Sequence, residues 1–114
     1  MLFDRRPAQD FAVMTSEEVL SERLPVTRVF HFASGGWMYV SGHEDDDSEP
    51  LWVHYRHVEE LDPTLTTLAL RKGRYAMRWQ IDTPWFVYGP LSDERVDVLL
   101  YDGTIDTQHA DLEG

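Results

Sequence analysis

Short stretches in which polar and apolar residues alternate predict that most of the regular structure is β-strand. The clearest is residues 74–79, where the alternation puts Arg74, Ala76 and Arg78 on one face and Tyr75, Met77 and Trp79 on the other. Further runs rich in β-branched and aromatic residues predict strands at residues 11–14, 26–32, 37–40, 51–55 and 85–88.

The strands at 26–32 and 37–40 flank the turn signal Ser34-Gly35-Gly36 and are therefore expected to form a hairpin. Period-two alternation then places Val29 and His31 on one face of the hairpin, and Phe30 and Phe32 on the other.

Two short helices are expected between the strands. Thr15 or Ser16 can cap the first, with Glu17 and Glu18 at its positive end, and Pro25 ends it. A helical turn is expected at 57–61. Asp62 or Thr64 can cap the second helix, whose buried side is predicted to be Leu65, Leu68 and Leu70, and whose end is predicted at Arg71-Lys72-Gly73.

Strands in antiparallel order with two short helices between them indicate a small single α+β domain, mainly an antiparallel sheet. We expect this domain to span residues 11–101, after an irregular segment at 1–10 and before an acidic tail at 102–114. Within it, residues 96–101 are compatible with either a strand or a helical turn.

Charge and composition narrow the possible partners. The 114 residues include 21 acidic and 10 basic residues, which give a formal net charge of −11. Such a field repels nucleic acids and anionic membranes and attracts cationic partners, although solubility alone also explains it. The chain has no cysteine, so disulfides and thiolate chemistry are excluded. No apolar run is long enough to span a bilayer, and the first residues lack a secretory signal, so we expect a cytoplasmic protein.

Five acids occupy six positions in the loop predicted at 42–50: Glu44, Asp45, Asp46, Asp47 and Glu49. Their spacing does not match the calcium loop of EF-hands. Such a loop is expected to be exposed to solvent, and its functional interpretation is a surface that docks onto a basic partner.

Catalytic and metal-binding patterns are weak. His54 and His57 lie three residues apart, with His43 before them and Glu59 after, but no third ligand stands at a recognisable spacing. No serine lies in a Gly-x-Ser-x-Gly elbow, and phosphate-binding glycine loops are absent. We therefore predict no catalytic residues, no metal and no cofactor; a small enzyme or metal-binding protein that uses the histidines and the acidic loop remains the alternative.

One block resembles a known family. The run Gly36-Trp37-Met38-Tyr39-Val40-Ser41-Gly42-His43-Glu44-Asp45 is similar to a stretch of bacterial polymorphic-toxin immunity proteins of family thirty-three and its relatives, first described as a domain of unknown function. Residues 11–16, 25–29, 61–63 and 73–79 resemble further parts of the family in the same order. The likeness covers residues 11–88 and departs at 54–58, where an Asn-rich segment is expected.

The resemblance implies a non-catalytic protein that binds a cognate secreted toxin and occludes its active site; a house-keeping interaction module with the same fold is a further alternative. Aromatic residues beside the acidic loop are candidate anchors for such a partner. The predicted partner-binding residues are Trp37, Tyr39, His43, Glu44, Asp45, Asp46, Asp47, Glu49 and Trp52. The oligomeric state stays open.

Overall fold

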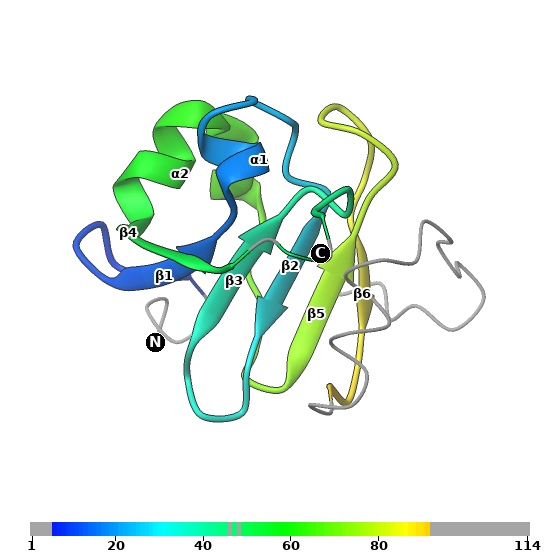
Figure 1. The fold of residues 1–114 in the computed structure, drawn as a ribbon. Helices are drawn as coiled ribbons and strands as arrows, with labels where there is room; N and C mark the ends of the chain where they lie inside the picture. The colour runs from blue at the N-terminus through cyan, green and yellow to red at the C-terminus, as the bar shows by residue number, and fades with distance from the viewer. Residues whose placement is uncertain (1–5, 46, 48, 92–114) are drawn as a thin grey trace.

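The expected α+β fold is present in the computed structural model, which describes residues 6–45, 47 and 49–91 (Figure 1). The predicted strand or turn at 96–101 and the tail at 102–114 lie outside these residues. In chain order the elements are β1 (Ala12–Thr15), α1 (Glu17–Leu20), β2 (Arg28–His31), β3 (Trp37–Val40), β4 (Leu51–His54), α2 (Tyr55–Leu61), the 3-10 helix η2 (Pro63–Thr67), β5 (Arg74–Met77) and β6 (Phe86–Tyr88).

The six strands form one sheet in the order β4-β1-β3-β2-β5-β6. The predicted hairpin of β2 and β3 is confirmed, with Val29 opposite Tyr39 and Phe30 opposite Met38. All pairs are antiparallel except β1 with β3, which is parallel. This exception arises because the chain crosses from β1 through α1 to β2, and β3 then returns into the space between β1 and β2.

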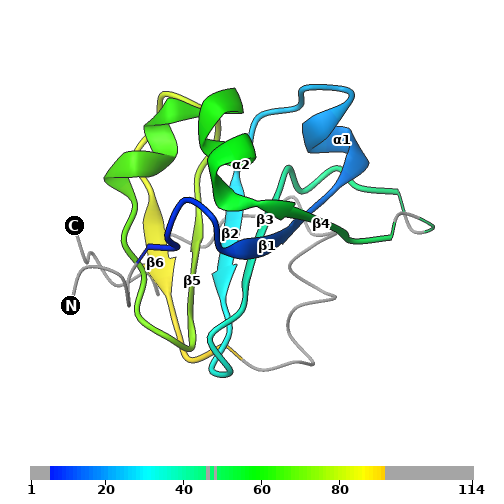
Figure 2. The same ribbon diagram turned by 90° about the vertical axis from the view of Figure 1, so that its left-hand side faces the viewer.

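Apolar side chains are buried on both faces of the sheet. The helices lie over one face of the sheet (Figure 2). On that face Val19 of α1, Val58 of α2 and Leu65 of η2 belong to one buried cluster with Val29 and Ala76 of the sheet. The other face carries a second cluster, made of Phe30, Met38, Val40, Tyr75, Met77 and Tyr88. The predicted alternation in β2 and β5 is therefore confirmed, and it separates two cores rather than a core from solvent.

Local capping starts two of the helices at the residues that the sequence predicts. The Ser16 hydroxyl accepts a hydrogen bond from the Val19 amide and caps α1, and an Asp62 carboxylate oxygen accepts from the Thr64 amide and caps η2. Pro63 follows at the first helical position, where its missing N–H costs nothing.

Several predicted boundaries are wrong. The first helix, expected to end at Pro25, ends at Leu20, and Tyr55, expected in the strand at 51–55, begins α2. The helix expected to run to residue 70 ends at Thr67, because Leu68 is already extended; Leu68 and Leu70 are nevertheless buried as predicted. Gly73, expected as a helix stop, instead has φ of 81° in the turn that enters β5. At the other end β5 stops at Met77, so Trp79 leaves the sheet and is 58% exposed rather than buried beside Tyr75.

A buried ion pair joins the helices to the sheet. Arg78, 2% exposed, is salt-bridged through Nη2 to Asp62, which is 3% exposed. Its Nε donates to the Val26 carbonyl at 3.0 Å, and Nη1 donates to Thr64 Oγ1 and the Ile81 carbonyl, each at 2.9 Å. Burial lowers the pKa of Arg78 from its ordinary value, and the Asp62 carboxylate opposes that shift.

Asp62→Asn tests this ion pair while leaving an oxygen to cap η2. The substitution removes the charge that compensates a buried guanidinium, so we expect a loss of about 3–5 kcal/mol in the free energy of unfolding, measured by denaturant titration. The control is Asp10→Asn, which removes an exposed pair with Arg56 and should cost no more than about 1 kcal/mol. Equal losses in the two variants would contradict the assignment.

Candidate functional site

The loop between β3 and β4 is held from within by Glu44. One oxygen of its carboxylate accepts hydrogen bonds from the Ser41 amide at 2.9 Å, the Ser41 hydroxyl at 2.7 Å and the Ser16 hydroxyl at 2.7 Å. The other oxygen accepts from the Gly42 amide at 2.8 Å. We call this set of four hydrogen bonds the Glu44 clasp. Because Ser16 also caps α1, the clasp ties the loop to the start of that helix.

A glycine is required inside the clasp. Gly42 has φ of 83°, a conformation that residues with a side chain rarely adopt. A Cβ built at this position would lie 1.5 Å from Nη1 of Arg28, which is itself buried. The segment Ser41-Gly42-His43-Glu44 thus has a structural explanation: it shapes the loop before any partner is considered.

Beyond Glu44 the loop presents its charges to solvent. Asp45, Asp47 and Glu49 are exposed, and His43 is exposed beside them, whereas Asp46 lies outside the described residues. The Asp45 amide donates to a Glu18 carboxylate oxygen at 3.1 Å, so the backbone of this exposed part is also fixed to α1. Trp52, on the strand that follows, is 65% exposed.

Two predicted anchors are corrected. Trp37 and Tyr39 are each 3% exposed, because β3 lies in the middle of the sheet and their side chains point into the cluster beneath the helices. The Trp37 ring stacks on His31 at 3.8 Å between centroids, and the Tyr39 ring packs against Tyr55 at 5.6 Å. Both rings therefore belong to the core. The prediction for Glu44 is also wrong: its carboxylate is not a solvated charge of the loop but the acceptor at the centre of the clasp.

The buried tyrosines carry altered acidities. Burial raises the pKa of Tyr39 well above its ordinary value, with the charges of Tyr55 and Glu59 adding to the effect. The pKa of Tyr55 is raised by burial and then by the neighbouring Glu59 carboxylate. Both phenols therefore keep their protons to a higher pH than an exposed tyrosine does.

The histidines do not assemble a metal centre within the described part of the chain. The rings of His54 and His57 stack at 6.0 Å between centroids. Among residues 6–45, 47 and 49–91, no three histidine, aspartate or glutamate side chains lie close enough together to hold a metal ion.

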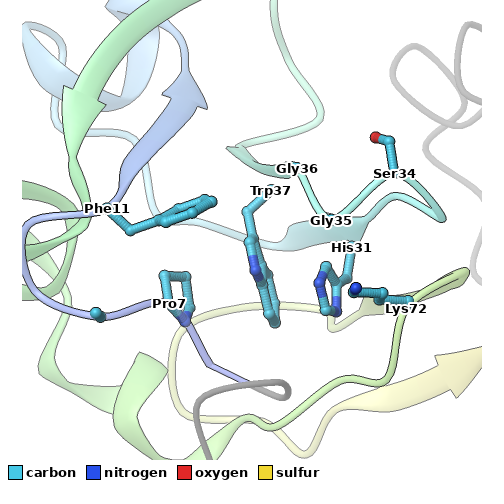
Figure 3. A pocket seen from close by; sticks show the side chains of 9 residues that line it. Pro7, Phe11, His31, Ser34, Gly35, Gly36, Trp37 and Lys72 are labelled. Atoms are coloured by element: carbon cyan, nitrogen blue, oxygen red, sulfur yellow. The ribbon is translucent and has the colours of Figure 1, made fainter.

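A hollow of about 470 Å³ that the sequence analysis did not predict opens beside β2 and β3 (Figure 3). Phe11 and Pro7 form one wall, the Trp37 ring stands in the middle, and His31 and Lys72 lie beyond it. His31 Nδ1 lies 2.8 Å from the Leu70 carbonyl, which fixes the orientation of the imidazole. Such a lining can accept an apolar or aromatic group. Among its residues the sequence marks Trp37 as a partner anchor and Ser34-Gly35-Gly36 as a turn, but neither pattern predicts a hollow.

Comparison of the chain with models of protein families, with curated proteins and with solved structures finds no match. Within the described residues, no helix is both long and apolar enough to cross a membrane.

The Glu44 clasp predicts a specific loss of stability. In Glu44→Gln one carboxylate oxygen becomes an amide that cannot accept hydrogen bonds, so amide and hydroxyl donors lose their partner. We expect a decrease of about 1.5–3 kcal/mol in the free energy of unfolding. Asp47→Asn, which changes an exposed neighbour in the same loop, should stay within about 0.5 kcal/mol of the wild type. A Glu44→Gln protein as stable as Asp47→Asn would refute the clasp.

The raised pKa of Tyr55 predicts a loss of stability in alkaline solution. The unfolded chain releases the phenol proton near its ordinary pKa of 10.0, whereas the folded chain retains it to higher pH. The contribution is therefore complete below pH 10 and is lost as the pH rises above that value. Denaturant titrations at several alkaline pH values should show a steeper fall for the wild type than for Tyr55→Phe; parallel curves would exclude a shifted Tyr55.

Proposed function

We propose that this chain is a cytoplasmic immunity protein that binds a cognate bacterial toxin and occludes its active site without catalysis. The observation that carries the proposal is an acidic loop with a pre-shaped base: the Glu44 clasp fixes the backbone where the loop begins, and Asp45 and Asp47 beyond it face solvent. The resemblance of residues 36–45 to toxin immunity proteins supports the same function.

A loop whose base is fixed before binding favours tight inhibition. The backbone of residues 41–45 loses little conformational freedom on association, because hydrogen bonds to Glu44 and Glu18 already hold the amides of Ser41, Gly42 and Asp45. The net charge of −11 steers a cationic surface toward the protein and raises the association rate.

The loop best fits a catalytic cleft lined by lysine and arginine. Closely spaced exposed carboxylates imitate the charge of a phosphodiester backbone, so we propose a toxin that acts on nucleic acid. A house-keeping interaction module would present the same surface, and only the identity of the bound partner distinguishes it from an immunity protein.

The decisive experiment is purification of the tagged protein from its native cell, followed by mass spectrometry of what it retains. The proposal expects one secreted-toxin domain at equal stoichiometry, whose activity is lost in the complex. A bound partner that is not a toxin would favour the house-keeping module, and a toxin that keeps its activity in the complex would exclude occlusion.

The loop can then be tested with a charge-matched pair of variants. Asp45→Asn/Asp47→Asn should weaken toxin binding by about tenfold or more, mainly through slower association at low salt, because it removes the exposed charges but leaves Glu44 intact. The control, Glu17→Gln/Glu22→Gln, removes two exposed charges from the region of α1 and should bind within about twofold of the wild type. Surface plasmon resonance measures the association and dissociation rates. Equal losses of affinity in the two double variants would show that the loop is not the interface.

A further inference from the structure

β4 is an edge of the sheet, and its side chains do little to protect it. It stands first in the strand order and pairs only with β1 among the described strands. Trp52 is 65% exposed and Leu51 37% exposed, and no residue of the strand is a lysine, arginine, aspartate or glutamate. Natural sheets usually place charged residues on such edges to prevent pairing with another chain.

The phase of the β1–β4 ladder shows which backbone groups face outward. The Tyr55 amide donates to the Phe11 carbonyl at 2.9 Å, so residues 51, 53 and 55 direct their polar groups toward β1. The alternate residues therefore point away from the sheet. They present two donors, the amides of Trp52 and His54, and two acceptors, the carbonyls of Pro50 and Trp52.

We propose that β4 pairs with β4 of a second copy of this chain, antiparallel and about a two-fold axis at Trp52. In this register each Trp52 amide meets the Trp52 carbonyl of the other copy, and each His54 amide meets a Pro50 carbonyl. All four outward groups then find a partner. A surface that matches itself in this way is what a two-fold symmetric interface requires.

The charges that flank β4 fit the same register. Exposed Glu49 precedes the strand and exposed Arg56 follows it. An antiparallel pair centred on Trp52 brings the acidic end of each strand beside the start of α2 in the other copy. Arg56, which already lies 3.3 Å from Asp10, gains a second acidic neighbour there. The overall charge of −11 opposes association, but salt screens it beyond about 8 Å at physiological ionic strength.

Pairing also completes an apolar row that crosses all six strands. Direct cross-strand neighbours link the row from end to end: Trp52, Met14, Met38, Phe30, Tyr75 and Tyr88. The members from Met38 to Tyr88 are each at most 8% exposed, whereas Trp52 is largely open to solvent. The Trp52 ring of a second copy would cover it, since opposed residues in such a pair lie about 5.5 Å apart.

The inference is independent of the proposed function, because it concerns the isolated protein and assigns Trp52 to self-association instead of to the toxin. Sedimentation velocity over a wide range of concentrations should give a mass that rises to twice that of the chain. Trp52→Ala keeps the amide and should raise the dissociation constant about tenfold. Trp52→Pro removes the outward amide, which β1 does not use, and should leave only monomer.

Trp79→Ala is the matched control, since Trp79 is similarly exposed but lies in the loop after β5, and it should dimerise as the wild type does. A monomer at every concentration would overturn the proposal. So would a dimer that survives Trp52→Pro, because a different surface would then form it.

A cross-link keeps the inference testable if Trp52→Pro fails to fold. The chain has no cysteine, so Trp52→Cys introduces a single thiol at the axis, within the range of Cα separations that a disulfide spans. Under mild oxidation this variant should form covalent dimers much faster than Trp79→Cys. Equal rates for the two variants would overturn the two-fold at Trp52.

Discussion

The buried guanidinium of Arg78 is the interaction on which the remaining architecture depends. It follows the last residue of β5, yet it contacts the backbone before β2, the cap of η2 and the loop before β6, and its charge lies over the Trp85 ring at 4.2 Å. A charge so far from water requires its acidic partner in place. Asp62 therefore serves twice, as the cap of η2 and as the counter-ion, and the helical layer is positioned over the sheet by the same carboxylate that starts one of its helices.

Acidic residues have two opposite roles in the loop between β3 and β4. Glu44 is consumed by hydrogen bonds within the fold, whereas Asp45 and Asp47, one and three residues further on, have side chains that face solvent. The segment Ser41-Gly42-His43-Glu44 is thus largely the part that shapes the loop. The residues proposed to meet the toxin, Asp45 and Asp47, come immediately after that shaped part and have exposed side chains.

The sequence predicted the strands well, because period-two alternation and β-branched content are local properties. It did not predict that β3 would enter between β1 and β2, since strand order depends on contacts between distant residues. Because β3 is central, Trp37 and Tyr39 are buried and do not serve as surface anchors. The hollow that Phe11 and Trp37 line depends on the same strand order, so the sequence did not predict it either. Similarly, alternation placed Arg78 on the face of Ala76, but nothing local pairs it with an aspartate sixteen positions earlier.

The Glu44 clasp has a consequence for how the domain can change over time. It draws on Ser16, Ser41 and Gly42, and none of its hydrogen bonds involves the residues that follow Glu44 in the loop. Substitution, insertion or deletion among those later residues leaves the fastening intact, and lengthening a loop costs little, about 0.6 kcal/mol for each doubling. The domain is therefore suited to carry a variable segment after Glu44. New binding specificities can be acquired or engineered in that segment without changes to the rest of the fold.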